Sequence, residues 1–210
     1  MAENDLFRIN ENNPEYWWFR RRQEKDIILL VNGYGCHFDS PLGWIYLPEV
    51  VRFIDENFYR IRLVIPLGGF TQRETAPGIS EAGLMAEYLR ARCKNIPLIL
   101  VEDGSYTTYG NSQKGAEKIE ENGPIDKSKT IIVHFCEATR AANVVMLDRH
   151  FLLHLVQTID DIIVRTASWE KANPFKQVGN LIYNKLAISF PWLGLAEREL
   201  RRRVLKAERA

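Results

Sequence analysis

Along most of the chain, short apolar runs of strand length alternate with longer stretches in which the apolar residues have helical spacing. Apolar runs of strand length stand at residues 27–31, 61–65, 98–101 and 130–135, with a last one within 161–167. Stretches with helical spacing lie between them, at 47–58, 80–92 and 111–122 and from about 139. Such alternation is typical of βαβ units, whose right-handed crossovers make the strands parallel. The pattern predicts a doubly wound, Rossmann-like α/β domain with a parallel sheet of about five strands.

Two segments fall outside this alternation. Residues 1–25 form a predicted N-terminal arm, in which Trp17, Trp18 and Phe19 precede three arginines. We expect the arm to pack on the domain edge, because adjacent large aromatics exposed together favour association. After an α/β domain at 26–168, residues 169–210 form a predicted C-terminal extension of two helices that separate near Pro191. The basic runs in the arm and the last helix are either solvated surface or contacts for anionic lipid or nucleic acid.

Composition narrows the class of protein. The 210 residues carry 28 Lys and Arg against 27 Asp and Glu, so no overall charge draws the chain to nucleic acid. No apolar run has the length of a membrane span, and no basic leader marks a signal peptide. Three cysteines without a C-x-x-C pair argue against a disulfide framework. We therefore expect a cytoplasmic protein in a reducing compartment.

Glycines follow the first two predicted strands, at the edge where parallel sheets bind ligands. Gly33 and Gly35 follow the first strand, and Gly68 and Gly69 the second. They either let backbone amides approach a ligand or serve tight strand exits. Phe38 stands where a G-x-G-x-x-G motif needs its last glycine, and no acid ends the second strand. The sequence therefore does not favour a conventional dehydrogenase or a standard methyltransferase.

Polar residues follow the third and fourth strands. Glu102 could accept from ribose-like hydroxyls, bind a cation or act as a general base. Ser105 and Thr108 would line the following loop, and Asn111 would be a ligand contact or a helix N-cap. Arg140 could meet a carboxylate or phosphate. The structural alternative is a salt bridge between Glu102 and Arg140 that closes the sheet end.

Helix capping, hydrolysis and metal binding each require residues in a particular arrangement. Ser80 is a predicted N-cap, and Glu81 suits the first turn of the helix that follows. No G-x-S-x-G elbow is present, which argues against a hydrolase triad. Five metal-binding residue types fall near strand ends but lack ligand spacing, so no metal site is predicted: Cys36, His37, His134, Cys136 and Glu137.

The motifs from the second strand onward resemble the YdcF-like family, which includes SanA-like and ElyC-like envelope proteins. The matching residues are Gly68, Gly69, Ser80, Glu81, Ala82, Met85, Leu89, Glu102, Ser105, Thr108 and Asn111. The resemblance covers roughly residues 26–148. Gly110 stands where the family usually has Glu, and Glu137 where it usually has His before Arg140, so a role that needs this histidine is not expected. The resemblance implies a parallel α/β sheet, a ligand such as S-adenosylmethionine or another nucleotide, and for some relatives a role in the cell envelope.

We therefore expect a protein that binds a small polar or nucleotide-like molecule at the carboxyl ends of the strands. The alternatives are a hydrolase or transferase acting on a phosphorylated or sugar-linked substrate, with Glu102 as base, and a non-catalytic envelope-associated scaffold. The expected partner is a small molecule and not nucleic acid; the sequence leaves the oligomeric state open. The candidate ligand-binding residues are Gly33, Gly35, Gly68, Gly69, Glu81, Glu102, Ser105, Thr108, Asn111 and Arg140.

Overall fold

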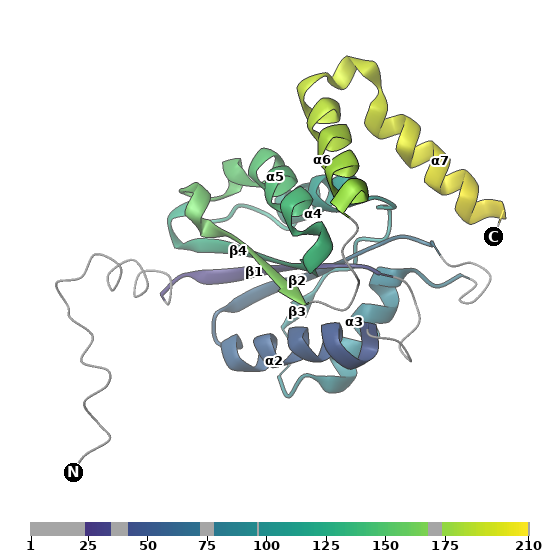
Figure 1. The fold of residues 1–210 in the computed structure, drawn as a ribbon. Helices are drawn as coiled ribbons and strands as arrows, with labels where there is room; N and C mark the ends of the chain where they lie inside the picture. The colour runs from purple at the N-terminus through teal and green to yellow at the C-terminus, as the bar shows by residue number, and fades with distance from the viewer. Residues whose placement is uncertain (1–23, 35–41, 72–77, 96, 168–173, 210) are drawn as a thin grey trace, which may run out of the picture.

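The computed structural model describes residues 24–34, 42–71, 78–95, 97–167 and 174–209. It confirms the predicted α/β class: five parallel strands form one sheet in the order β3-β2-β1-β4-β5 (Figure 1). The strands are β1 (Asp26–Asn32), β2 (Ile61–Leu67), β3 (Leu98–Ile99), β4 (Thr130–Glu137) and β5 (Ile162–Ala167). The predicted arm aromatics, Gly35, Cys36 and His37 lie outside the described residues.

Helices cover both faces of the sheet, as a doubly wound fold requires. In Figure 1, α2 (Leu47–Asn57) and α3 (Glu81–Arg92) lie on one face, and α4 (Thr108–Glu121) and α5 (Ala141–Phe151) on the other. Successive strand residues point to opposite faces of the sheet. Leu29 packs in the apolar core under α2 and α3, and Leu30 packs in the core under α4. Both residues are fully buried. This two-sided burial explains why the strands read as continuous apolar runs.

Several element boundaries differ from the prediction. Helix α4 begins at Thr108 rather than at Asn111, because the Thr107 hydroxyl caps it by accepting from the Gly110 amide at 2.9 Å. The third strand is short, and beyond it only an isolated bridge from Leu67 reaches Glu102. Strand β4 runs on to Glu137, two residues beyond the predicted run, and His134 lies inside it. Short helical turns connect the main elements: η1 (Leu42–Tyr46), η2 (Lys127–Lys129), η3 (Ala138–Arg140), η4 (Leu153–Leu155) and η5 (Ile159–Asp161).

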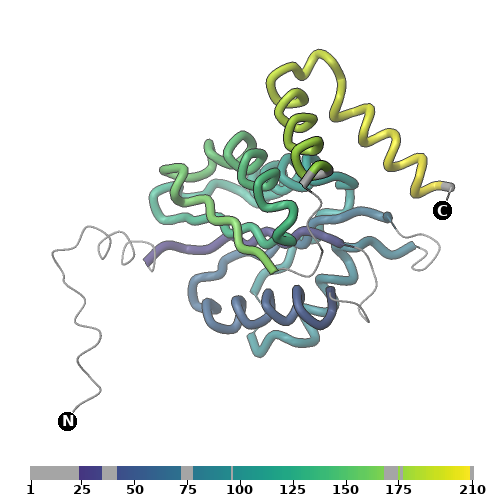
Figure 2. The backbone as a smooth tube through the Cα atoms, viewed as in Figure 1, coloured from purple at the N-terminus to yellow at the C-terminus, as the bar shows by residue number. Residues whose placement is uncertain are grey.

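The C-terminal part forms two helices, with the break near Pro191 as predicted. Helix α6 (Pro174–Ser189) packs on α5, and after the turn η6 (Pro191–Leu193) the chain enters α7 (Leu195–Arg209). Gly194 has a left-handed φ of 60°, which glycine adopts without strain. Figures 1 and 2 show this hairpin standing out from the α4–α5 side. Within the described ranges no helix combines the length and apolarity needed to cross a membrane.

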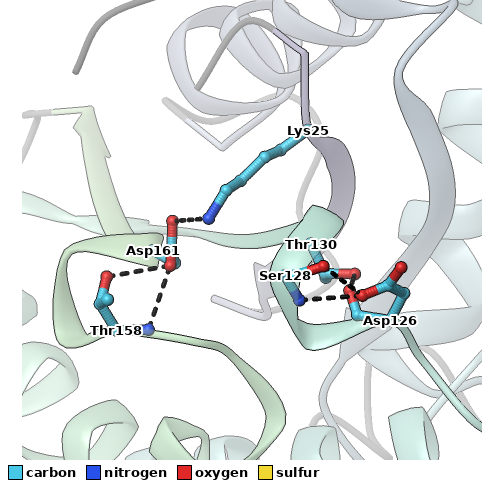
Figure 3. Close-up of polar contacts among 6 residues, drawn as sticks. All are labelled: Lys25, Asp126, Ser128, Thr130, Thr158 and Asp161. Atoms are coloured by element: carbon cyan, nitrogen blue, oxygen red, sulfur yellow. Dashed lines mark hydrogen bonds and ion pairs between the residues drawn. The ribbon is translucent and has the colours of Figure 1, made fainter. Parts of the chain in front are cut away.

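Near the amino ends of the strands, polar side chains form hydrogen bonds and an ion pair with one another (Figure 3). Lys25 Nζ lies 2.6 Å from Asp161 Oδ1, and the other oxygen of Asp161 accepts from the Thr158 amide and hydroxyl. Asp126 accepts from the amide and hydroxyl of Ser128. By contrast, the buried side-chain oxygens that lack a partner in the described part of the chain all follow or end strands at the carboxyl edge: Glu102 Oε2, Ser105 Oγ and Glu137 Oε1.

Candidate functional site

A cavity of about 690 Å³ opens at the carboxyl ends of the strands. Its walls come from the loops after β1, β2, β3 and β4, from the starts of α3 and α4, and from α6 and α7. The predicted site residues that line it are Gly33, Gly68, Glu81, Ser105, Thr108, Asn111 and Arg140. Gly69 and Glu102 lie next to lining residues without lining the cavity themselves, and Gly35 is outside the described residues.

Gly33 and Gly68 make room for the Glu81 carboxylate. A Cβ on Gly33 would lie 2.3 Å from Glu81 Oε2 and 2.7 Å from the Leu67 carbonyl oxygen. Gly68 has a φ of 149°, and its Cβ would come within 3.0 Å of Glu81. Both glycine amides already donate to backbone carbonyls. These glycines therefore allow Glu81 to lie close to the sheet. Their amides are already hydrogen-bonded to backbone carbonyls within the fold.

The loop between β2 and α3 is packed tightly beside the cavity. The Ser80 hydroxyl accepts from the Gly83 amide at 3.0 Å, which confirms the predicted N-cap. Glu81 follows in the first turn of α3 and accepts from the Thr71 hydroxyl. The Gly69 amide donates to the Ser105 carbonyl at 2.6 Å, so this loop is tied to the one after β3. The carboxylate of Glu81 is thereby held at the cavity wall.

Two buried oxygens after β3 lack hydrogen-bond partners among the described residues. Glu102 Oε1 accepts from the Gly104 amide at 2.9 Å, but Glu102 Oε2 and Ser105 Oγ accept from and donate to nothing described. Burial raises the pKa of Glu102, and the neighbouring Ser105 hydroxyl and Gly104 amide offset part of that rise. Buried polar atoms left without partners cost free energy, which a polar ligand or water would recover.

Arg140 and Tyr34 meet where the strand order reverses, between β1 and β4. The Arg140 guanidinium carbon lies 4.5 Å from the centroid of the Tyr34 ring, a cation–π contact. The Tyr34 hydroxyl accepts from the Glu137 amide at 2.6 Å, which fixes the ring between the two strands. Burial raises the pKa of Tyr34, although Arg140 acts in the opposite direction. The site thus presents a positioned guanidinium at the point where doubly wound sheets bind ligands.

The predicted alternative, a salt bridge between Glu102 and Arg140, is not formed. Among the described residues no carboxylate pairs with Arg140. The sheet order gives the reason, because β2 and β1 separate β3 from β4. Three strand spacings amount to about 14 Å, which the two side chains could span only if both were fully extended toward each other. The guanidinium is therefore available to an external anion.

A buried polar network lies beneath the cavity. Asn111 Nδ2 donates to Asn32 Oδ1 at 2.8 Å, and His134 Nε2 lies 2.9 Å from the same oxygen. The other ring nitrogen of His134 lies 2.9 Å from Asp148 Oδ2, and the Ser112 hydroxyl donates to Asp148 Oδ1 at 2.7 Å. All five side chains are buried. Because its nitrogen is engaged by Asn32, Asn111 leaves its amide oxygen as the acceptor available to the cavity.

The sequence interpretation missed the wall that α6 and α7 contribute. Tyr183 and Asn184 of α6 and Glu199, Arg202 and Arg203 of α7 line the cavity. Burial alone would raise the pKa of Glu199, but hydrogen bonds from Arg202 and Arg203 outweigh it and lower the pKa. The charged lining therefore consists of the guanidinium groups of Arg140, Arg202 and Arg203 and the carboxylates of Glu81 and Glu199. This net positive charge favours an anionic ligand.

Metal-binding residue types do not gather in the described part of the chain, where no three His, Cys, Asp or Glu side chains could hold one ion. Cys136 is buried, and burial together with the charges of Asp148 and Glu137 raises its pKa to about 12. Its thiol is therefore protonated at neutral pH. What the described cavity offers is hydrogen bonding and charge.

Comparisons with protein-family models, with curated proteins and with solved structures found no match. The function has therefore to be argued from the cavity and its position in the fold.

Proposed function

We propose that this protein binds, in the cavity, a small molecule that carries an anionic group together with hydroxyl or amino groups, such as a nucleotide. The observation that carries the proposal is Arg140, held over Tyr34 at the β1–β4 junction and not paired with any described carboxylate. Ligands of doubly wound α/β proteins bind at this junction. A guanidinium there recognises phosphate or carboxylate through its fork of donors.

The remaining polar lining fits the other groups of such a molecule. The amide oxygen of Asn111 can accept from a hydroxyl or amino group, and Ser105 lines the same wall of the cavity. Thr108 begins α4, and the positive end of that helix dipole also points at the cavity wall. A ligand with only an anionic group would leave the Asn111 amide oxygen without a donor, so we favour one with several polar groups.

The resemblance to the YdcF-like family supports the same class of ligand, since it implies S-adenosylmethionine or another nucleotide. Both carry an acidic group and ribose hydroxyls, the combination that the cavity lining suits. Binding is favoured over hydrolysis or group transfer, because Glu102, the predicted base, is buried beside Gly104 and does not line the cavity. We therefore propose a YdcF-like binding protein for a nucleotide-like molecule.

The test is a comparison of two arginine variants. AMP, ATP, S-adenosylmethionine and inorganic phosphate are first screened for a rise in melting temperature, since a ligand that binds the native state stabilises it. Calorimetry then measures the affinity of any compound that raises it. Arg140→Gln should weaken binding by about 10- to 150-fold, the equivalent of a charge-assisted hydrogen bond. Arg165 stacks on Phe53 outside the cavity, so Arg165→Gln is the matched control and should bind normally.

Two results would contradict the proposal. One is the absence of stabilisation by every compound in the screen. The other is equal affinity of Arg140→Gln and the unsubstituted protein for a compound that does bind.

A further inference from the structure

Helix α6 has two different faces. One lines the cavity through Tyr183 and Asn184, among others. The opposite face carries a row of apolar side chains spaced three or four residues apart, which places them on one side of the helix. We call this row the α6 stripe; it consists of Phe175, Val178, Ile182 and Leu186. All four side chains are exposed, and Phe175 is 90% exposed.

The apolar surface continues past the end of α6 into the turn that leads to α7. Phe190 and Trp192 contact each other edge to face, with ring centroids 5.2 Å apart, and Leu193 follows them. All three side chains are exposed, Trp192 to 75%. Single exposed apolar residues are ordinary, but a continuous set of this size marks an interaction surface.

Positive charge accompanies this surface. Helix α6 contains two lysines, Lys176 and Lys185, and no acidic residue. Helix α7 carries six basic residues, Arg198, Arg201, Arg202, Arg203, Lys206 and Arg209, against three acids, Glu197, Glu199 and Glu208. Glu199 is already engaged by two of the arginines. Arg198 and Arg201 are exposed, so the hairpin that carries the apolar stripe also presents an excess of positive charge.

We propose that the α6 stripe and the turn after it dock on a membrane surface that contains anionic lipids. Tryptophan and phenylalanine are favoured at the boundary between headgroups and acyl chains, where an amphipathic helix can lie in the plane of the interface. Basic residues beside such a helix are attracted to anionic headgroups. A second copy of this chain fits the face less well, because two copies would bring like charges together and α6 has no acid to pair with them.

This inference is independent of the proposed ligand site. The stripe lies on the side of α6 that faces away from the cavity, so substitutions in it leave the cavity lining in place. Ligand affinity measured in solution and vesicle affinity therefore report on separate surfaces. Failure of one proposal would not imply failure of the other.

The experiment is co-sedimentation of the full chain with phosphatidylcholine vesicles that contain or lack phosphatidylglycerol. Binding should require the anionic lipid and weaken with added salt. Trp192→Ser should reduce vesicle affinity by about tenfold or more, the loss expected when one large apolar side chain is removed from a buried position. Arg201→Gln should reduce it by about fivefold, the equivalent of one basic residue at an anionic surface.

Trp44 provides the matched control, since it is exposed in η1, on the chain segment that leads into α2. Trp44→Ser should bind vesicles like the unsubstituted protein. The proposal is overturned if anionic vesicles do not bind the chain, or if Trp44→Ser weakens binding as much as Trp192→Ser. It is also overturned if only substitution of Trp17 and Trp18 abolishes binding, or if light scattering detects a dimer that Ile182→Ser dissociates, because a second copy would then occupy the stripe.

Discussion

Replacing Asp148 with asparagine tests the buried network that orients Asn111. The Asp148 side chain has no exposed surface. Its Oδ1 accepts from the Ser112 hydroxyl at 2.7 Å, and its Oδ2 lies 2.9 Å from His134 Nδ1. Asparagine keeps the volume but removes the charge and one of the two acceptor oxygens. Leaving a buried donor or acceptor without its partner costs about 1–3 kcal/mol. We therefore expect the free energy of unfolding to fall by about 1–3 kcal/mol, a substantial part of the stability of a typical domain.

The assay is urea denaturation at neutral pH. Asp160→Asn, an exposed aspartate on the turn before β5, is the control and should unfold close to the unsubstituted protein. Ser112→Ala removes one hydrogen bond and should cost about 1 kcal/mol. A double-mutant cycle of Asp148→Asn with His134→Gln should give a coupling energy above about 1 kcal/mol. A loss below about 1 kcal/mol for Asp148→Asn, or additive effects in the cycle, would refute the account of these side chains as one unit.

Two further substitutions address the loops around the cavity. Because burial raises the pKa of Glu102 above its ordinary value of 4.5, the unsubstituted protein should lose stability relative to Glu102→Gln as the pH rises through that range. Urea melts in a pH series check this, and a relative gain in stability with rising pH would contradict it. Gly33→Ala should destabilise the fold by about 1–3 kcal/mol, because its Cβ would meet Glu81 and a backbone oxygen. Gly179→Ala, on α6 with open space around it, should instead stabilise by up to about 1 kcal/mol, and equal effects of the two would contradict the packing explanation.

The sheet and the residues at its carboxyl edge were accessible from the sequence because they follow from local periodicity. The strand-length apolar run at 27–31 and the capping Ser80 before α3 are signals contained within a few residues. Once the strands are parallel, the residues after each strand must share one edge. Gly33, Gly68 and Arg140 therefore line one cavity even though more than a hundred residues separate the first from the last.

Other parts of the site depend on tertiary packing and left weak signals. Asp148 lies four residues after Val144 on the buried face of α5, a position where an acid needs a partner. That partner, His134, lies inside β4, and its contact with Asp148 depends on how α5 packs against the strand. Tyr183 and Arg202 line the cavity only because of how the hairpin folds back over it, which no local pattern determines.

The most direct test of the central claim is a crystal structure of the protein with the compound from the screen that stabilises it most. The account predicts the anionic group of that compound within hydrogen-bond distance of the Arg140 guanidinium, and a hydroxyl or amino group donating to Asn111. A compound bound elsewhere on the surface, or one seated in the cavity without contacting Arg140, would contradict it.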